Sequence, residues 1–186
     1  AKRENFDWLN KRLEWSVSWG AVYKKKTIKN LRFAEDLTVG EDTYFFAQAI
    51  NNVRTVARID YALYNYSLND DSVTARKWRE SSKSELIARQ RIKTMLENDK
   101  ILYPRARAGN AATCLNFVAR YYNDDAFIEN ALPYCKRIFQ EDFWELLKGV
   151  IKNKRADVFC KAVVFAISPR LYIQIYRLRY RNGRKR

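Results

Sequence analysis

The sequence predicts a mixed α/β chain that is mostly helical, with a few short strands in its first part and successive helices after it. Hydrophobic residues make up 47% of the 186 residues and aromatic residues 15%, which is typical of a folded core rather than of disorder. Only five glycines and three prolines interrupt long periodic stretches. The pattern changes near Arg79 from short mixed elements to helices. We therefore divide the chain into residues 1–79 and 80–186.

The first part is predicted to alternate helices with extended segments. Helices are favoured where apolar residues recur at helical spacing, and strands where β-branched or aromatic residues alternate with others. The expected elements are helices at about 5–13, 27–30 and 44–51, extended segments at 15–23 and 31–33, and strands at 53–59 and 61–67.

The second part is predicted to be all helical. Ser82 and Glu85 have the spacing of a capping box, and Ser168-Pro169 is typical of a cap followed by a first-turn proline. Pro133 is expected to end one helix. The expected helices, in chain order, are about 82–98, 104–122, 125–133, 141–152, 156–167 and 170–181.

The formal net charge of +15 predicts a polyanionic partner, which could be nucleic acid, an anionic membrane surface or a phosphate-bearing ligand. The charge is concentrated at one end, because the last seventeen residues carry seven Lys or Arg and no acid.

Several classes of protein are disfavoured by the composition. No run of about 20 apolar residues predicts a membrane-spanning helix, and the N-terminal residues have no signal-peptide core, so we expect a cytoplasmic location. Cys114, Cys135 and Cys160 are odd in number, widely spaced and in apolar helical contexts, so we expect buried free thiols rather than a disulfide framework or a zinc site. The absence of histidine excludes histidine-based catalysis and histidine metal ligands within this chain.

The best candidate for chemistry is the corner Gly40-Glu41-Asp42, which precedes the helix expected at 44–51. Glycine adopts backbone angles closed to other residues, and carboxylates in a first helical turn are stabilised by the helix dipole. A carboxylate held in this way can accept a proton from a substrate hydroxyl. Taken alone, the same residues are also typical of an ordinary acidic helix start.

Five motifs follow one another in one order within about residues 15–76. They are Trp19-Gly20-x-x-Tyr23-Lys24-Lys25, Leu31-Arg32-Phe33, Gly40-Glu41-Asp42-x-x-Phe45, Tyr61-x-x-Tyr64-x-Tyr66 and Ser72-Val73-Thr74. This arrangement resembles the C-terminal part of the catalytic domain of bacterial family 2 glycosyltransferases, the inverting enzymes of GT-A fold that use nucleotide sugars. The resemblance implies that 1–79 is the acceptor-side part of a GT-A domain and that 80–186 is a helical C-terminal extension with a basic tail.

By that resemblance the chain moves a sugar from a nucleotide-sugar donor to an acceptor hydroxyl, in cell-surface polysaccharide or glycolipid synthesis. Asp42 would be the catalytic base, and Glu41 would orient the acceptor or position the base. Trp19 would line the acceptor side, although core packing explains it as well. Arg76 would contact the diphosphate, unless it only tethers the helical region. Lys24, with Lys25 and Lys26, would meet donor phosphates or acidic lipid, although a solvated charged face is the favoured interpretation.

The donor-binding half of such an enzyme has no counterpart in this sequence. A divalent metal, Mg or Mn, is expected for the full-length enzyme, but its ligands are not in this chain, so no metal residue is named and activity in isolation is not expected. The implied partners are a nucleotide-sugar donor and a saccharide or lipid-linked acceptor.

The basic end from Ser168 to Arg186 combines arginines with Tyr, Leu and Ile. Such an amphipathic segment suits an anionic bilayer surface, which would place the protein peripherally at the inner membrane face. The alternatives to a bilayer contact are a merely soluble tail and, least favoured, binding to nucleic acid. The alternative function is a non-enzymatic basic helical module that binds nucleic acid or an acidic partner.

Overall fold

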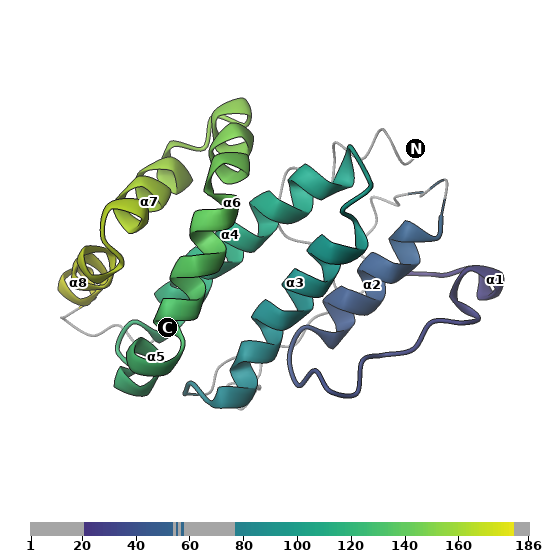
Figure 1. The fold of residues 1–186 in the computed structure, drawn as a ribbon, viewed down its shortest axis with the longest axis horizontal. Coiled ribbons are helices and arrows are strands. Elements are labelled where there is room, and N and C mark those ends of the chain that lie inside the picture. The colour runs from purple at the N-terminus through teal and green to yellow at the C-terminus, as the bar shows by residue number, and fades with distance from the viewer. Residues whose placement is uncertain (1–20, 54, 56, 58–76, 181–186) are drawn as a thin grey trace. The chain divides into compact units, whose positions relative to one another are not determined.

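A computed structural model of the chain describes residues 21–53, 55, 57 and 77–180, and this part is helical (Figure 1). The elements are α1 (Lys25–Ile28), α2 (Glu41–Asn51), the 3₁₀ turn η3 (Glu80–Lys83), α3 (Ser84–Met95), α4 (Leu102–Tyr121), α5 (Asp125–Asn130), α6 (Leu132–Lys152), α7 (Ala156–Ile167) and α8 (Pro169–Arg179).

The predicted α/β fold class, a C-terminal portion of a GT-A domain, is wrong. The described residues contain no strand, and Thr55 forms only an isolated bridge. Residues 31–33, where an extended segment was expected, have irregular backbone between α1 and α2. Alternating side chains make a strand only when neighbouring backbone supplies ladder partners, and nothing in the described ranges supplies them. The predicted strand at 61–67, and most of those at 15–23 and 53–59, lie outside these ranges.

The chain forms two compact units. Unit 1 comprises residues 1–76 and 80–103, and unit 2 comprises residues 77–79 and 104–186. The sequence predicted a division at 79/80, with an acceptor-side part before it and a helical extension with a basic tail after it. This division stays a prediction.

Unit 1 is built on α2 and α3, which contact each other along their apolar sides. Both helices start at the same end of the pair, because the Ser84 hydroxyl accepts from the Val39 N–H at 2.8 Å and donates to the Val39 carbonyl at 3.0 Å. The core residues of this pair are nearly inaccessible to solvent. They include Phe46, Ala49, Ile50, Leu86, Ala88 and Ile92.

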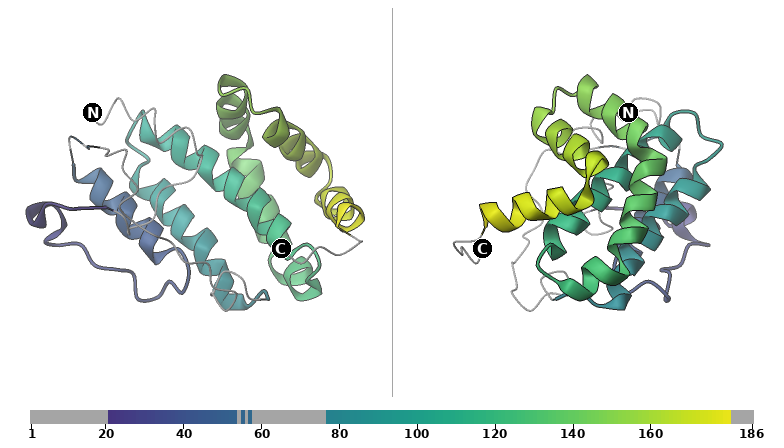
Figure 2. Two further views of the ribbon diagram at one scale, coloured as in Figure 1. Left: turned by 180° about the vertical axis from the view of Figure 1, so that it is seen from behind. Right: turned by 60° about the vertical axis from the view of Figure 1, so that its left-hand side comes forward.

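Unit 2 packs α4 to α8 around buried aromatic rings. Phe117 contacts Phe127 edge-on at 5.7 Å, and Phe139 contacts Phe165 at 4.8 Å between ring centroids. Helix α7 contacts both α6 and α8, and the three form one side of the unit (Figure 2). Pro133 falls in the first turn of α6, where proline is tolerated, so α6 runs unbroken to Lys152 and the predicted separate helix at 141–152 is its second half.

A buried polar network joins α4 to α6 inside unit 2. The Asp142 side chain is 1% exposed; it accepts from Arg107 Nε at 2.7 Å and from Asn110 Nδ2 at 3.2 Å. Glu145 lies 3.8 Å from Arg107 Nη1. A buried carboxylate is stable only when it is paired and hydrogen-bonded, so this network fixes how α4 meets α6.

Candidate functional site

The predicted corner in unit 1 is a rigid helix start. Gly40 is the N-cap of α2 with a φ of 91°, in the left-handed region that favours glycine. A Cβ on Gly40 would lie 2.9 Å from the Cβ of Ala88 and 3.3 Å from the Cα of Glu85. Both the backbone angle and the contact with α3 therefore require glycine at this position.

Glu41 and Asp42 occupy the first turn of α2, as expected, and both are half-buried. Asp42 Oδ1 accepts from the Thr43 N–H at 2.6 Å and lies 3.3 Å from the Thr43 hydroxyl. Burial, and after it the nearby Asp42 carboxylate, raise the pKa of Tyr23 above its ordinary value. The structure thus brings Tyr23 near Asp42, whose predicted role is that of a catalytic base. That role stays a prediction.

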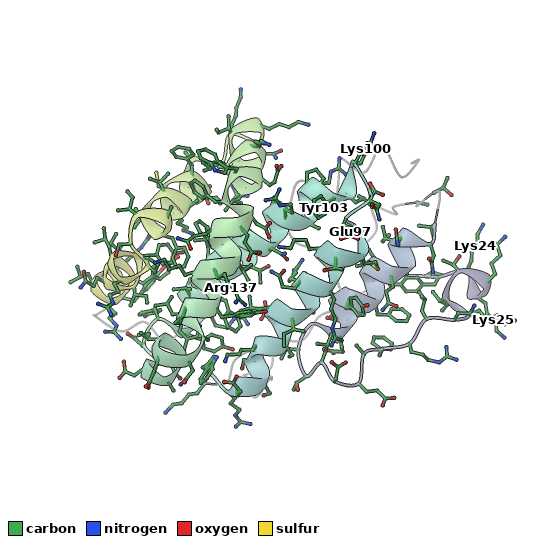
Figure 3. All side chains as sticks on the ribbon, in the orientation of Figure 1. Lys24, Lys25, Glu97, Lys100, Tyr103 and Arg137 are labelled. Atoms are coloured by element: carbon green, nitrogen blue, oxygen red, sulfur yellow. The ribbon has the colours of Figure 1, made fainter. Side chains whose placement is uncertain are left out.

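Two of the other predicted site residues, Trp19 and Arg76, lie outside the described residues. Lys24 is exposed and precedes α1, and Figure 3 shows Lys24 and Lys25 projecting outward from that turn. Phe45 is buried, while Phe33 stacks on it at 4.3 Å and is 49% exposed on its other side.

Unit 2 presents an exposed apolar surface on α7 and α8, which we call the outer face. At about 100° per residue, Leu171, Ile175 and Leu178 fall within about 60° of one another on α8. The side chain of Leu178 is 68% exposed, and that of Ile167 at the end of α7 is 73% exposed. The residues of the outer face are Phe159, Cys160, Ile167, Leu171, Ile175 and Leu178. The prediction that Cys160 is buried is therefore wrong, whereas Cys114 and Cys135 are buried as expected.

The opposite side of α8 holds the helix in place. Tyr172 is buried, and its hydroxyl lies 3.4 Å from the Leu115 carbonyl and 3.3 Å from the Tyr176 hydroxyl. Burial, followed by this contact with Tyr176, raises the pKa of Tyr172 well above its ordinary value. Arg177 Nε donates to the Tyr122 carbonyl at 3.2 Å. Because its inner side is anchored, α8 turns a second apolar side outward.

Cations surround the outer face. Residues 152–180 contain seven Lys or Arg and a single acid, Asp157. Asp157 is paired with Arg155 at 2.9 Å, and this partner lowers the pKa of the carboxyl to about 2. Arg170 and Arg179 are exposed on α8. The arrangement is an apolar surface with a cationic border.

Comparison with family models, curated proteins and solved structures gave no match. The predicted resemblance to family 2 glycosyltransferases is therefore corrected: no family model supports it, and the helices of the described ranges do not fit a portion of a GT-A domain. The order of five short motifs was too weak a signal, since each consists of residues that also serve as caps and core aromatics.

Two further findings concern metals and membranes. Among the described residues, no group of three or more Cys, Asp or Glu side chains is placed to hold a metal ion. The expectation of Mg or Mn concerned the full-length enzyme and is not tested by this. No helix in the described ranges is both long and apolar enough to cross a bilayer.

Sequence reasoning identified the basic end but missed most of the outer face. The spacing of Ile167, Leu171, Ile175 and Leu178 was visible in the sequence as a period of three to four residues. That spacing does not distinguish a stripe that faces the core from one that faces solvent. The burial of Tyr172 in the structure shows that the stripe of Leu171, Ile175 and Leu178 faces solvent.

Proposed function

We propose that this chain attaches peripherally to an anionic bilayer through the outer face of unit 2. The single observation that carries the proposal is the exposed stripe of Leu171, Ile175 and Leu178 on α8, with the exposed Ile167 at the end of α7, in a strongly basic stretch of the chain. Exposed contiguous apolar side chains are costly in water and mark an interaction site. Sugar transfer rested on the corrected resemblance and forms no part of the proposal.

The chemistry of the surface favours a bilayer over nucleic acid. A helix lying in the interface buries an apolar side below the headgroups while arginines at its border reach the phosphates. Nucleic acid instead binds to cations interleaved with exposed aromatic rings. Between Arg170 and Arg179 of α8, the exposed residues other than Arg177 are Leu171, Gln174, Ile175 and Leu178, and none of them is aromatic.

The test is a vesicle-binding titration with the double variant Leu171→Ser/Leu178→Ser. Moving an aliphatic side chain of this size out of water contributes about 1–2 kcal/mol when burial is partial. The double change should therefore weaken partitioning onto phosphatidylcholine–phosphatidylglycerol vesicles by about thirtyfold or more. Neither leucine is buried, so the circular dichroism spectrum should not change.

The matched control is Ile87→Ser/Ile101→Ser, which removes two exposed aliphatic side chains from unit 1. This control should bind vesicles as the wild type does. Equal binding by the leucine variant and the wild type would refute the proposal. So would a change of oligomeric state by light scattering without loss of vesicle binding, because the face would then be covered by a second copy.

Nucleic acid is tested in the same experiment with a single-stranded oligonucleotide. The bilayer proposal would be overturned if the wild type bound the oligonucleotide tightly and in a salt-sensitive way but did not bind the vesicles. That result would favour the nucleic-acid module.

A further inference from the structure

A second cationic surface lies in unit 1, far along the chain from the outer face. Residues 24–32, which we call the cationic segment, contain five Lys or Arg and no acid. All five of these side chains are exposed: Lys24, Lys25, Lys26, Lys29 and Arg32.

The backbone of this segment holds its cations in a compact turn. The Thr27 N–H donates to the Lys24 carbonyl at 2.8 Å, and the Leu31 N–H to the Ile28 carbonyl at 3.0 Å. Arg32 Nη1 caps the turn by donating to the carbonyls of Lys29 and Leu31 at 3.1 and 2.7 Å. The lysines are left to face solvent, and Lys24 and Lys25 do so visibly in Figure 3.

Two carboxylates that follow the segment in the chain have other partners. Asp36 forms a bidentate pair with Arg91 of α3, with Nη1 donating to Oδ1 at 3.0 Å, and this pair lowers the pKa of the Asp36 carboxyl. Asp42 is held by Thr43 at the start of α2. Within the part of the chain that the structure describes, no carboxylate pairs with a cation of the segment.

Two apolar side chains border the cationic segment. Val22 is fully exposed just before it, and Phe33 just after it covers Phe45 with one ring face and is open on the other. Lysines beside an exposed aromatic ring and an aliphatic side chain match the headgroup layer of a bilayer, where cations meet phosphates and rings lie at the interface.

We infer that the cationic segment is a second, electrostatic contact with anionic lipid headgroups, and that it makes attachment depend on lipid charge. The inference rests on the proposed bilayer attachment and gives the two units different tasks. The outer face contributes apolar burial, and the cationic segment contributes charge attraction, which salt screens over about 8 Å at physiological ionic strength.

The experiment compares two triple variants that lower the net charge equally. Lys24→Gln/Lys25→Gln/Lys26→Gln neutralises the cationic segment. The matched control, Lys77→Gln/Lys100→Gln/Lys136→Gln, neutralises three exposed lysines elsewhere. A cation close to an anionic bilayer strengthens binding about fivefold, so the first variant should bind phosphatidylcholine–phosphatidylglycerol vesicles about tenfold to a hundredfold more weakly.

The control should lose less than about threefold, because its lysines act only through the net charge. On vesicles of phosphatidylcholine alone neither variant should differ from the wild type. Equal losses by the two variants, or a loss by the first variant that persists on uncharged vesicles, would overturn the inference.

The outcome separates this inference from the proposed function. If the leucine variant of the outer face loses binding while the two lysine variants behave alike, the cationic segment is not a contact and the outer face still is. If only the segment variant loses binding, the outer face is not the contact and the segment is. If the segment variant loses binding to an oligonucleotide but not to vesicles, the inferred partner is wrong.

Discussion

Gly40→Ala is expected to destabilise unit 1 through two separable effects. The left-handed backbone angle at Gly40 costs about 1–2 kcal/mol for a residue with a Cβ. The new Cβ would meet the Cβ of Ala88 at 2.9 Å, and overpacking of this kind costs about 1–3 kcal/mol. Reduced freedom of the unfolded chain offsets about 0.4–1 kcal/mol. The net loss should be about 2–4 kcal/mol.

The second variant, Gly40→Ala/Ala88→Gly, separates the two effects. Removing the Ala88 Cβ relieves the overlap but leaves the backbone cost, and glycine within α3 adds about 1 kcal/mol. Urea unfolding followed by circular dichroism measures the free energy of unfolding of the wild type, both single variants and the double variant. The double variant should be more stable than the sum of the single changes predicts, by about 1 kcal/mol or more. Additivity within about 0.5 kcal/mol, or a cost below that for Gly40→Ala, would refute the contact argument.

Two further predictions concern ion pairs in unit 2. Arg107→Met should cost about 3–5 kcal/mol in the free energy of unfolding, because it removes the cation that pairs with the buried Asp142 carboxylate. Arg107→Met/Asp142→Leu should recover most of that loss. A cost below about 1 kcal/mol for the single change would contradict the network. The carboxyl carbon of Asp157 should titrate by NMR near the pKa of about 2, and in Arg155→Gln near its ordinary value. Since the folded-state pKa is lowered, the pair stabilises the fold above the unfolded pKa of about 3.9 and loses this effect as pH falls through about 2. An unchanged Asp157 titration in the Arg155 variant would show that the pair is not its cause.

Local signals in the sequence predicted the helix boundaries best. Ser168 caps α8 by accepting from the Leu171 N–H at 3.2 Å, and Pro169 follows it in the first turn, as their order predicted. The helix start at Gly40-Glu41-Asp42 was also predicted, because its residues act on their own backbone. Signals of this kind need no information about the rest of the fold.

The errors came from features that depend on distant residues. The helix predicted from Asp125 does end near Pro133, at Asn130, but the next helix begins at Leu132 and not at about residue 141, because Pro133 is a first-turn residue of α6. The Ser82 capping box predicted a start two residues before that of α3, and it could not show that the Ser84 hydroxyl bridges the backbone of Val39. The predicted α/β fold and the GT-A resemblance were wrong because a strand needs neighbouring strands to pair with. Neither alternating side chains nor the order of motifs shows whether such strands are present.

The same limit applies to the candidate site. The charge at the end of the chain was visible in the sequence, as was the carboxylate pair of the corner. Two other features depend on packing and were not visible in the sequence. They are the approach of Tyr23 to Asp42 and the exposure of Leu171 and Leu178 to solvent. Residues that face solvent and residues that face the core share one spacing in α8, so only the fold separates them.

The measurement that tests the central claim most directly uses the exposed cysteine of α7. Cys160 is exposed on the outer face, while Cys114 and Cys135 are buried, so a thiol-reactive, environment-sensitive fluorophore should label Cys160 alone. The control is Cys160→Ser/Ile101→Cys, which moves the label to an exposed site in unit 1.

Vesicles of phosphatidylcholine and phosphatidylglycerol should shift the emission of the Cys160 label to the blue and increase its intensity, because α7 enters the headgroup–acyl boundary. The label at residue 101 should change little. A bound protein whose Cys160 label keeps its aqueous spectrum would contradict the account, since the outer face would then not be the surface that meets the bilayer.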